Sequence, residues 1–325
     1  MKRVAPLLLL IALSIPAFAR ASDYSALMKA RKFTDAEQLA SSRLAQDPAN
    51  AEALVAKVNA IIEGGKGGRF DEAARLAEQC VAAHPQLATC HLALGNALGA
   101  KAIANGIMSA LAYAGTIRDA FKKALELDPH NVEARMALMS YYLQAPAIVG
   151  GGSGKARALT AQTAALDPAA AKVMQARLDV DDERFAAAEG AMLAMPVSSV
   201  DALADGQRDV LLAVGGAYMK TKRSADAERV LREAARRFPD SDAPLYSLAR
   251  VQQEQGKHRD AIALFEQVLA RTPGGGAWYR LGQSQQALGE KSKAVSAYER
   301  ALAAGTLPKA ARADTEAQLL ALRQK

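Results

Sequence analysis

The sequence predicts an all-α fold, a solenoid of about eight helix pairs closed by a C-terminal capping helix. Three observations predict it. Alanine and leucine are abundant, whereas runs of strand-forming residues are scarce. A small residue followed four positions later by a bulky one recurs along the chain, and a proline closes most of the recurring segments. Such self-similarity is typical of stacked helical hairpins, because one hairpin cannot bury its apolar face alone.

The N-terminal segment has the parts of a secretory signal peptide. Lys2 and Arg3 form a positive region, the apolar run 4–15 follows, and small residues around Ala21 suit a signal peptidase. The run is shorter than the roughly 20 apolar residues that a membrane-spanning helix needs. We therefore expect residues 1–21 to be removed on export, which gives a periplasmic protein or, alternatively, a secreted one. A retained membrane anchor is the other interpretation.

The charge and composition argue against several functional classes. The formal net charge is +7, and removal of Lys2, Arg3 and Arg20 lowers it to +4, with both signs interspersed. Aromatic residues make up 5% of the chain, too few for base-stacking platforms, so no nucleic-acid partner is expected. No Ser–His–Asp, Cys–His or paired-carboxylate arrangement emerges, so we expect neither an enzyme nor a bound cofactor. No later apolar run is long enough to cross a membrane.

The most regular repeats lie in residues 201–325. Small residues at Ala227, Ala261 and Ala294 are spaced by 34 and 33 positions. The bulky residues that follow them by four positions are Leu231, Phe265 and Tyr298, and Pro239 and Pro273 close two of the segments. The small residue lets two helices approach, the bulky one fills the gap beside it, and the proline stops the second helix.

This pattern resembles the tetratricopeptide repeat, and Trp278, Leu281 and Gly282 match the Trp-x-x-Leu-Gly opening of its first helix. The resemblance implies a right-handed superhelix whose concave face is lined by the first helix of each pair. It also implies a non-enzymatic scaffold that binds a protein partner. Relatives that grip chaperone C-termini use a clamp of Lys, Asn and Arg. This chain has Tyr, Gln and Gly at the matching positions, so that partner is not carried over.

Residues 22–200 carry the same frame more loosely. The closing prolines Pro48, Pro85, Pro129 and Pro168 are spaced by 37, 44 and 39 positions, which indicates insertions. We therefore divide the chain into a signal peptide (1–21), divergent repeats (22–200), and regular repeats with a capping helix (201–325).

A glycine-rich loop, Gly150-Gly151-Gly152, precedes Lys155 and suggests a phosphate-binding loop. A P-loop needs Gly-x-x-x-x-Gly-Lys-Ser/Thr after a strand, but Val149 and Ala156 occupy two of its required positions and helical spacing precedes. The stretch resembles an A-P-x-x-x-G-G-x-x-x-K-A segment of exported bacterial proteins of this repeat type. Two interpretations stay open: a connector between two helices, or a loop that overhangs the groove and contacts a ligand.

Cys80 and Cys90 lie five residues on either side of Pro85, where two antiparallel helices meet. In an exported protein these positions predict a disulfide. Two buried thiols are the alternative. Zinc binding with His84 and His91 is a third interpretation, although the spacing matches no common zinc finger.

The repeat frame also predicts a partner-binding surface. Helix-one side chains should line the concave face, and their aromatic area and hydrogen-bonding groups suit a peptide. The predicted residues are Asn96, Leu212, Met219, Tyr246, Arg250, Gln253, Tyr279, Gln283 and Gln286.

Residues 95–121 contain an insertion of about ten residues, which lengthens both helices of that pair or adds a short third helix. Its apolar residues Ile103, Ile107, Leu111 and Ile117 are partly at helical spacing. They would fill the core or, alternatively, line a pocket for a ligand.

Two functions follow from these features. The first is an interaction scaffold in the bacterial cell envelope, holding a protein or peptide segment in the concave groove. The alternative is a small apolar ligand-binding protein associated with envelope transport, with the insertion and the glycine loop enclosing the ligand.

Overall fold

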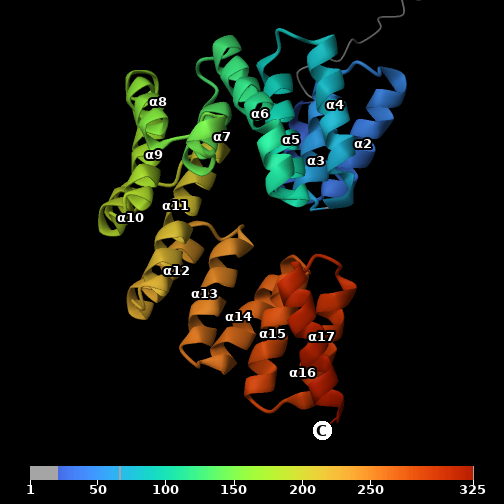
Figure 1. The fold of residues 1–325 in the computed structure, drawn as a ribbon, viewed down its shortest axis with the longest axis vertical. Helices are drawn as coiled ribbons and strands as arrows, with labels where there is room; N and C mark the ends of the chain where they lie inside the picture. The colour runs from blue at the N-terminus through green and yellow to red at the C-terminus, as the bar shows by residue number, and fades with distance from the viewer. Residues whose placement is uncertain (1–20, 66, 325) are drawn as a thin grey trace, which may run out of the picture. The chain divides into compact units, whose positions relative to one another are not determined.

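A computed structural model describes residues 21–65 and 67–324 of the chain. Within these residues it contains seventeen α-helices, two short 3-10 turns and no strand, so the all-α solenoid prediction is confirmed (Figure 1). The predicted signal peptide lies outside the described residues, apart from Ala21 at the start of the first helix.

Taken two by two in chain order, the first sixteen helices make eight sequence pairs, and a final helix follows them. The first four pairs are α1 (Ala21–Lys29) with α2 (Phe33–Gln46), α3 (Ala51–Glu63) with α4 (Phe70–Ala83), α5 (Ala88–Asn105) with α6 (Ile107–Leu127), and α7 (Val132–Gln144) with α8 (Ser153–Leu166). The next four are α9 (Pro168–Asp181) with α10 (Phe185–Ala194), α11 (Asp201–Lys220) with α12 (Ser224–Arg237), α13 (Asp242–Glu254) with α14 (His258–Arg271), and α15 (Gly275–Ala287) with α16 (Lys291–Ala303). Helix α17 (Lys309–Gln324) packs on α16 as the predicted cap.

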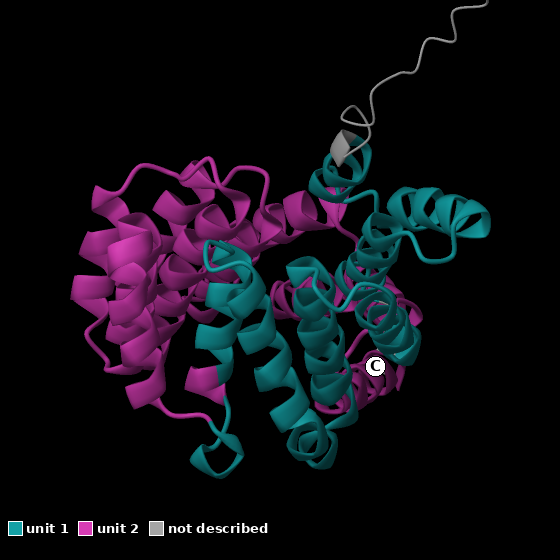
Figure 2. Cartoon of the chain, turned by 90° about the horizontal axis from the view of Figure 1, so that it is seen from above, with its two compact units in different colours: residues 1–141, 145–150 teal, residues 142–144, 151–325 magenta. Residues whose placement is uncertain are grey.

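The chain divides into two compact units, which Figure 2 distinguishes by colour. Unit 1 comprises residues 1–141 and 145–150, and unit 2 comprises 142–144 and 151–325. The sequence boundary at residue 200 was based on the regularity of the repeats, and it stays a prediction.

The contact between a small and a bulky residue recurs inside the helix pairs. A side-chain carbon added at Gly282 of α15 would lie 2.7 Å from the Tyr298 ring of α16, and one added at Gly215 would lie 2.7 Å from Leu231. In unit 1, the same test at Gly95 of α5 places the added carbon 2.3 Å from the ring of Phe121. In these three pairs the two helices thus approach so closely that only glycine fits at these positions.

Polar side chains fasten the turns between pairs. Asn50 caps α3 by accepting a hydrogen bond from the backbone of Ala53, and Asn131 caps α7 in the same way. The carbonyl oxygen of the closing proline also finds a donor: Gln79 donates to that of Pro48 at 2.8 Å. Because a turn leaves helix-end carbonyls without backbone partners, these contacts stabilise the reversal of the chain.

Successive pairs are joined by a buried carboxylate in unit 2. Glu189 of α10 is 6% exposed and accepts a hydrogen bond from the Tyr218 hydroxyl of α11 at 3.0 Å. It also forms an ion pair with Arg229 of α12. Burial and the bond to Glu189 raise the pKa of Tyr218, so its hydroxyl stays a donor.

The insertion lengthens both helices of the third pair, to 18 residues in α5 and 21 in α6, and the two pack side by side (Figure 1). The prediction that its apolar residues fill the core is correct for Ile117, which is 7% exposed. It is wrong for Ile103, Ile107 and Leu111, which are 81%, 68% and 40% exposed. The hairpin extends past the neighbouring shorter helices, so no neighbour covers these side chains along their length.

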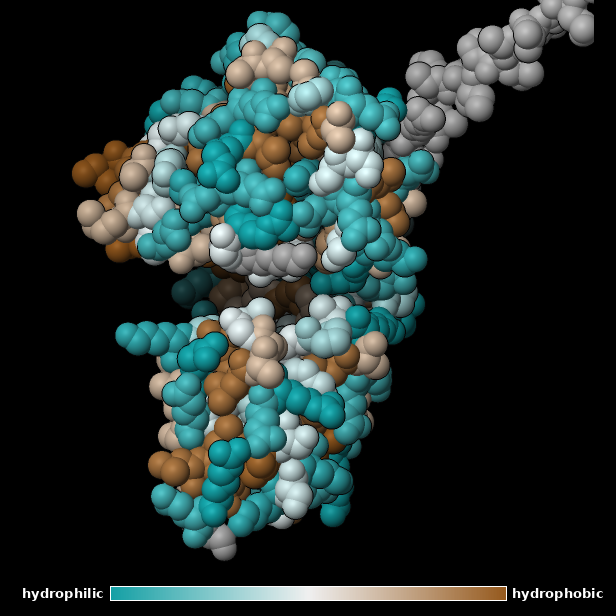
Figure 3. All heavy atoms as spheres, turned by 90° about the vertical axis from the view of Figure 1, so that its right-hand side faces the viewer, coloured by the Kyte–Doolittle hydropathy of each residue, from teal (hydrophilic) through white to brown (hydrophobic). Residues whose placement is uncertain are grey.

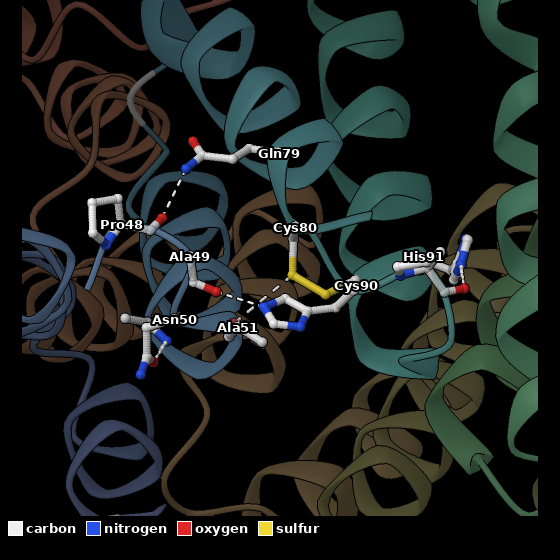
Figure 4. The surroundings of a disulfide bond; sticks show 11 residues. Pro48, Ala49, Asn50, Ala51, Gln79, Cys80, Cys90 and His91 are labelled. Atoms are coloured by element: carbon white, nitrogen blue, oxygen red, sulfur yellow. Dashed lines mark hydrogen bonds between the residues drawn. A yellow bond between two sulfur atoms is a disulfide. The ribbon is translucent and has the colours of Figure 1, made fainter. Parts of the chain in front are cut away.

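Cys80 of α4 and Cys90 of α5 form a disulfide across the seam between the second and third pairs (Figure 4). Both cysteines are fully buried, and they pack with Leu54 of α3. The ring of His84 faces the carbonyl oxygen of Ala49, and that of His91 lies 2.9 Å from the carbonyl oxygen of Pro85. All four donors that zinc would require therefore have other partners.

In residues 21–65 and 67–324, no helix combines the length and the apolar character that crossing a bilayer requires.

Replacing Gly282 by alanine tests the close approach of the paired helices. We expect Gly282→Ala to destabilise the protein by about 1–2 kcal/mol, because overpacking against the Tyr298 ring outweighs the better helix propensity of alanine. Gly216 is the matched control, since it also lies inside a helix but an added carbon meets nothing within 4 Å. Gly216→Ala should stabilise by up to about 1 kcal/mol. Urea denaturation followed by circular dichroism measures both, and equal effects would contradict the packing argument.

Candidate functional site

Eight of the nine predicted partner-binding residues lie in unit 2, on the first helices of three successive pairs. Leu212 and Met219 belong to α11; Tyr246, Arg250 and Gln253 belong to α13; Tyr279, Gln283 and Gln286 belong to α15. They repeat at equivalent turns of these helices, and all eight are half-buried. Asn96 lies in unit 1 on α5, where its amide lies 3.5 Å from Glu133 of α7, and it is not brought together with the others.

Hydrogen bonds connect α13 to α15 across this surface. The Gln253 amide donates to the backbone oxygen of Arg280 at 2.9 Å and to the hydroxyl of Ser284 at 2.8 Å. The Arg280 guanidinium in turn donates to the Gln253 oxygen at 3.3 Å. Gln253 therefore holds two neighbouring first helices in register.

The same kind of contact connects α15 to the capping helix. The Tyr279 hydroxyl donates to Asp314 at 2.8 Å and accepts from the Gln283 amide at 2.7 Å. The Gln286 amide donates to Gln318 at 2.8 Å, and the buried Tyr298 hydroxyl donates to the Gln286 oxygen at 2.7 Å. Tyr279, Gln283 and Gln286, like Gln253, thus have hydrogen-bond partners within the chain. Contact of these side chains with a ligand stays a prediction.

We call the contacts of Gln253, Tyr279, Gln283 and Gln286 with α15 and α17 the polar ladder. Sequence reasoning did not identify its other members, Arg280, Ser284, Asp314 and Gln318. The repeat pattern could have indicated Asp314 and Gln318. A capping helix that continues the pattern must face the first helix of the preceding pair. That signal gives the neighbouring helix but not the pairing of individual side chains.

Burial and the carboxylate of Asp314 perturb the tyrosine at the end of the ladder. They raise the pKa of Tyr279 to about 12, because the ionised phenolate would be poorly solvated and would face a negative charge. Burial above all raises the pKa of Tyr298 as well. Both hydroxyls therefore remain protonated donors at neutral pH.

Arg250 differs from its neighbours on this surface. Its Nε atom is buried and has no hydrogen-bond partner within the residues that the structure describes. The equivalent position one pair earlier is Gly216, where no side chain would be crowded, and one pair later it is Gln283 of the polar ladder. Arg250 is thus a half-buried cation that the polar ladder does not use.

The turn that leads into the glycine loop is fixed within unit 1. The carbonyl oxygen of Val149 accepts from the Tyr141 hydroxyl at 2.6 Å and from Arg118 of α6 at 3.4 Å. Gly150 has a φ of 97°, and an added side-chain carbon would lie 2.5 Å from the Arg118 guanidinium. Ala156 is fully buried in α8, as the repeat frame requires. This geometry supports an ordered connector, and ligand contact by residues 150–152 stays a prediction.

Two cavities lie beside α2 in unit 1. One of about 230 Å³ is lined by Arg31, Asp35 and Glu37 among others, and one of about 550 Å³ is lined by Glu37 and Arg69 among others. Arg69 bridges Glu37 and Glu72, at 2.7 Å from each carboxylate. These linings are charged, so neither cavity is the apolar pocket of the alternative function.

The regular repeats match a known family. A model of the tetratricopeptide repeat matches residues 212–275 and 246–308. This match covers α12–α16 and the C-terminal part of α11, and it supports the family resemblance drawn from Trp278, Leu281 and Gly282. No curated protein sequence matches the chain.

Two solved structures share the fold over most of the chain. The Cut9 and Hcn1 hetero-tetramer of APC/C aligns with a TM-score of 0.55 and 16% identity, over 96% of this chain and 51% of that one. Yeast Tom70 aligns with a TM-score of 0.62 and 13% identity, over 90% of this chain and 59% of that one. This chain therefore spans between half and three fifths of the length of those proteins. At such identity the likeness concerns the fold alone.

The raised pKa of Tyr279 predicts a specific loss of stability in alkali. A tyrosine in the unfolded chain ionises near pH 10, whereas folded Tyr279 ionises near 12. Its contribution to stability is therefore complete below pH 10 and is lost as the pH rises from about 10 to 12. The pKa values of Tyr218 and Tyr298 are raised as well, so we expect a tyrosinate absorbance titration to show several late-ionising groups, of which Tyr279→Phe removes one. Asp314→Asn should shift that group toward 10, and an unchanged titration would contradict the proposed contact.

Proposed function

We propose that this protein is a non-enzymatic interaction scaffold of the bacterial cell envelope, which binds an extended segment of a protein partner along α11, α13 and α15. One observation carries the proposal. The polar ladder fixes α13 and α15 in register and joins α15 to the capping helix, so that the side chains of these first helices form a pre-ordered surface, which α11 continues by packing on α13. A surface that is already ordered loses little conformational entropy when a peptide binds.

The residues outside the ladder supply the contacts. Leu212 and Met219 offer apolar area, Tyr246 offers an aromatic ring, and Arg250 offers a cation whose Nε lacks a partner in the described part of the chain. Aromatic and arginine side chains dominate binding energies at protein interfaces. This combination suits a partner segment that carries apolar side chains and a carboxylate.

Export to the envelope is supported by two features. The N-terminal residues 1–21 have the pattern of a signal peptide. The pairing of Cys80 with Cys90 suits an oxidising compartment.

The alternative, a small apolar ligand-binding protein, receives no support from the described residues. The apolar side chains on which it relies, at Ile103, Ile107 and Leu111, are exposed at the surface. They enclose no pocket in the position that the alternative requires.

In-cell photo-crosslinking tests the scaffold. A photoreactive residue at Leu212 or Tyr246 should capture a discrete envelope protein, and Arg250→Ala should reduce the yield at least about fivefold, because a charged hydrogen bond contributes roughly 1.5–3 kcal/mol. Positions 212 and 246 are chosen over 279 because Tyr279 also holds α17.

The matched control is the same photoreactive residue at Glu266, which is exposed on the second helix α14. It should capture none of the proteins that are captured from positions 212 and 246. A shared spectrum of adducts at 212, 246 and 266, or a yield unaffected by Arg250→Ala, would overturn the groove proposal.

The disulfide gives an independent test of export. In intact cells both thiols should resist alkylation until a reductant is added, and Cys80→Ala/Cys90→Ala should destabilise the purified protein by about 2–3 kcal/mol. Thiol labelling by mass shift and urea denaturation are the measurements. Freely labelled cysteines in unreduced cells would argue for a reducing compartment.

A further inference from the structure

The hairpin of α5 and α6 extends beyond the helices next to it. Helices α3 and α4 have 13 and 14 residues, whereas α5 and α6 have 18 and 21. The surplus of 5 and 7 residues corresponds to roughly 7–10 Å of additional helix. It lies at the end where Gly106 joins the two helices with a φ of 85°.

The outermost turns of this hairpin expose large apolar side chains. Ile103, Ile107 and Met108 are 81%, 68% and 76% exposed, and Leu111 is 40% exposed one turn further along α6. We call these four residues the apolar tip. Large apolar residues are usually scattered singly among polar ones, whereas the face in Figure 3 shows apolar residues gathered in patches beside polar ones. Four within nine positions form a patch that requires a specific explanation.

The apolar tip has no charged residue, and the nearest charged side chains lie further along the two helices from Gly106. Residues 102–117 contain no Asp, Glu, Lys, Arg or His. The first charged group is Lys101, whose ammonium lies 4.8 Å from the ring centre of Tyr113 on the facing helix and 2.7 Å from Asp71 of α4. The outer turns are thus uncharged, with the exposed amide of Asn105 beside Gly106, and Lys101 and Tyr113 lie five and seven residues from that glycine.

We propose that the apolar tip docks this protein on a lipid bilayer by inserting into its interface. An uncharged apolar end with a lysine and a tyrosine behind it suits a bilayer surface, where aromatic and lysine side chains lie at the headgroup level and apolar ones lie below. The surplus length also matches the insertion depth of about 5–10 Å that is usual for interfacial helices. This inference is independent of the concave surface in unit 2.

A bilayer explains the tip better than another protein does. A protein interface would be expected to have a polar rim close to its apolar residues, whereas residues 102–117 contain no charged group. Lys101 is already paired with Asp71, so insertion should depend weakly on lipid charge.

Site-specific fluorescence and flotation test the proposal on the full chain. With Trp278→Phe as background, Ile107→Trp should shift its emission to the blue on phosphatidylethanolamine–phosphatidylglycerol vesicles and should be quenched by brominated lipid. Ile107→Ser/Met108→Ser should lower the vesicle partition coefficient at least about tenfold, since two large apolar side chains leave the membrane. Binding should persist at high salt.

Ile148 supplies the matched control. It is 90% exposed, lies in the 3-10 turn Ala147–Val149, and is held near Arg118, roughly 16 Å along α6 from Ile107. Ile148→Trp should show no shift on vesicles, and Ile148→Ser should leave partitioning unchanged. The apolar run 4–15 could also bind vesicles. It would not shift the emission of a tryptophan at position 107, because that emission reports only on its own surroundings.

Three outcomes would overturn the proposal. The first is an emission at Ile107→Trp that vesicles leave unchanged. The second is flotation that Ile107→Ser/Met108→Ser leaves unchanged. The third is a blue shift without lipid that grows with protein concentration and disappears in the double serine variant, which would assign the tip to a contact between copies.

Discussion

The close approach of the two helices within each pair is the constraint on which the structure depends. Where the first helix carries glycine, as at Gly95 and Gly282, the second helix places an aromatic ring directly against its backbone. When two helices approach so closely, they have one favourable packing arrangement. That arrangement also fixes which side chains of the pair face the next pair. The buried bonds of Glu189 and the hydrogen bonds of the polar ladder then fasten pairs that the crossing has already aligned.

The repeat frame predicted the helices well because its signals are local. A small residue, a bulky residue one turn later and a closing proline each act within a few residues, and all eight pairs and the cap follow from them. The polar ladder depends on contacts between residues far apart in sequence, such as Tyr279 with Asp314. The frame gives the face on which Tyr279 lies, but it does not show that the capping helix reaches its hydroxyl.

The insertion shows a second limit of the same reasoning. The spacing of Ile103, Ile107 and Leu111 correctly indicated helix, yet helical spacing says only that residues share a face. Whether that face is buried depends on the lengths of the neighbouring helices. Since α5 and α6 exceed α3 and α4 in length, their outer turns have no neighbour alongside, and the usual assignment of apolar residues to the core fails there.

The two proposed surfaces differ in the physical basis of their selectivity. On the proposed partner-binding surface a partner must match apolar side chains, the ring of Tyr246 and one cation, Arg250, so binding there discriminates between sequences. At the apolar tip the contact is non-directional and scales with the apolar area removed from water, so it selects a medium and not a sequence. A scaffold with both properties would increase the local concentration of its partner at a membrane, because docking restricts the search to a surface while the groove retains its specificity.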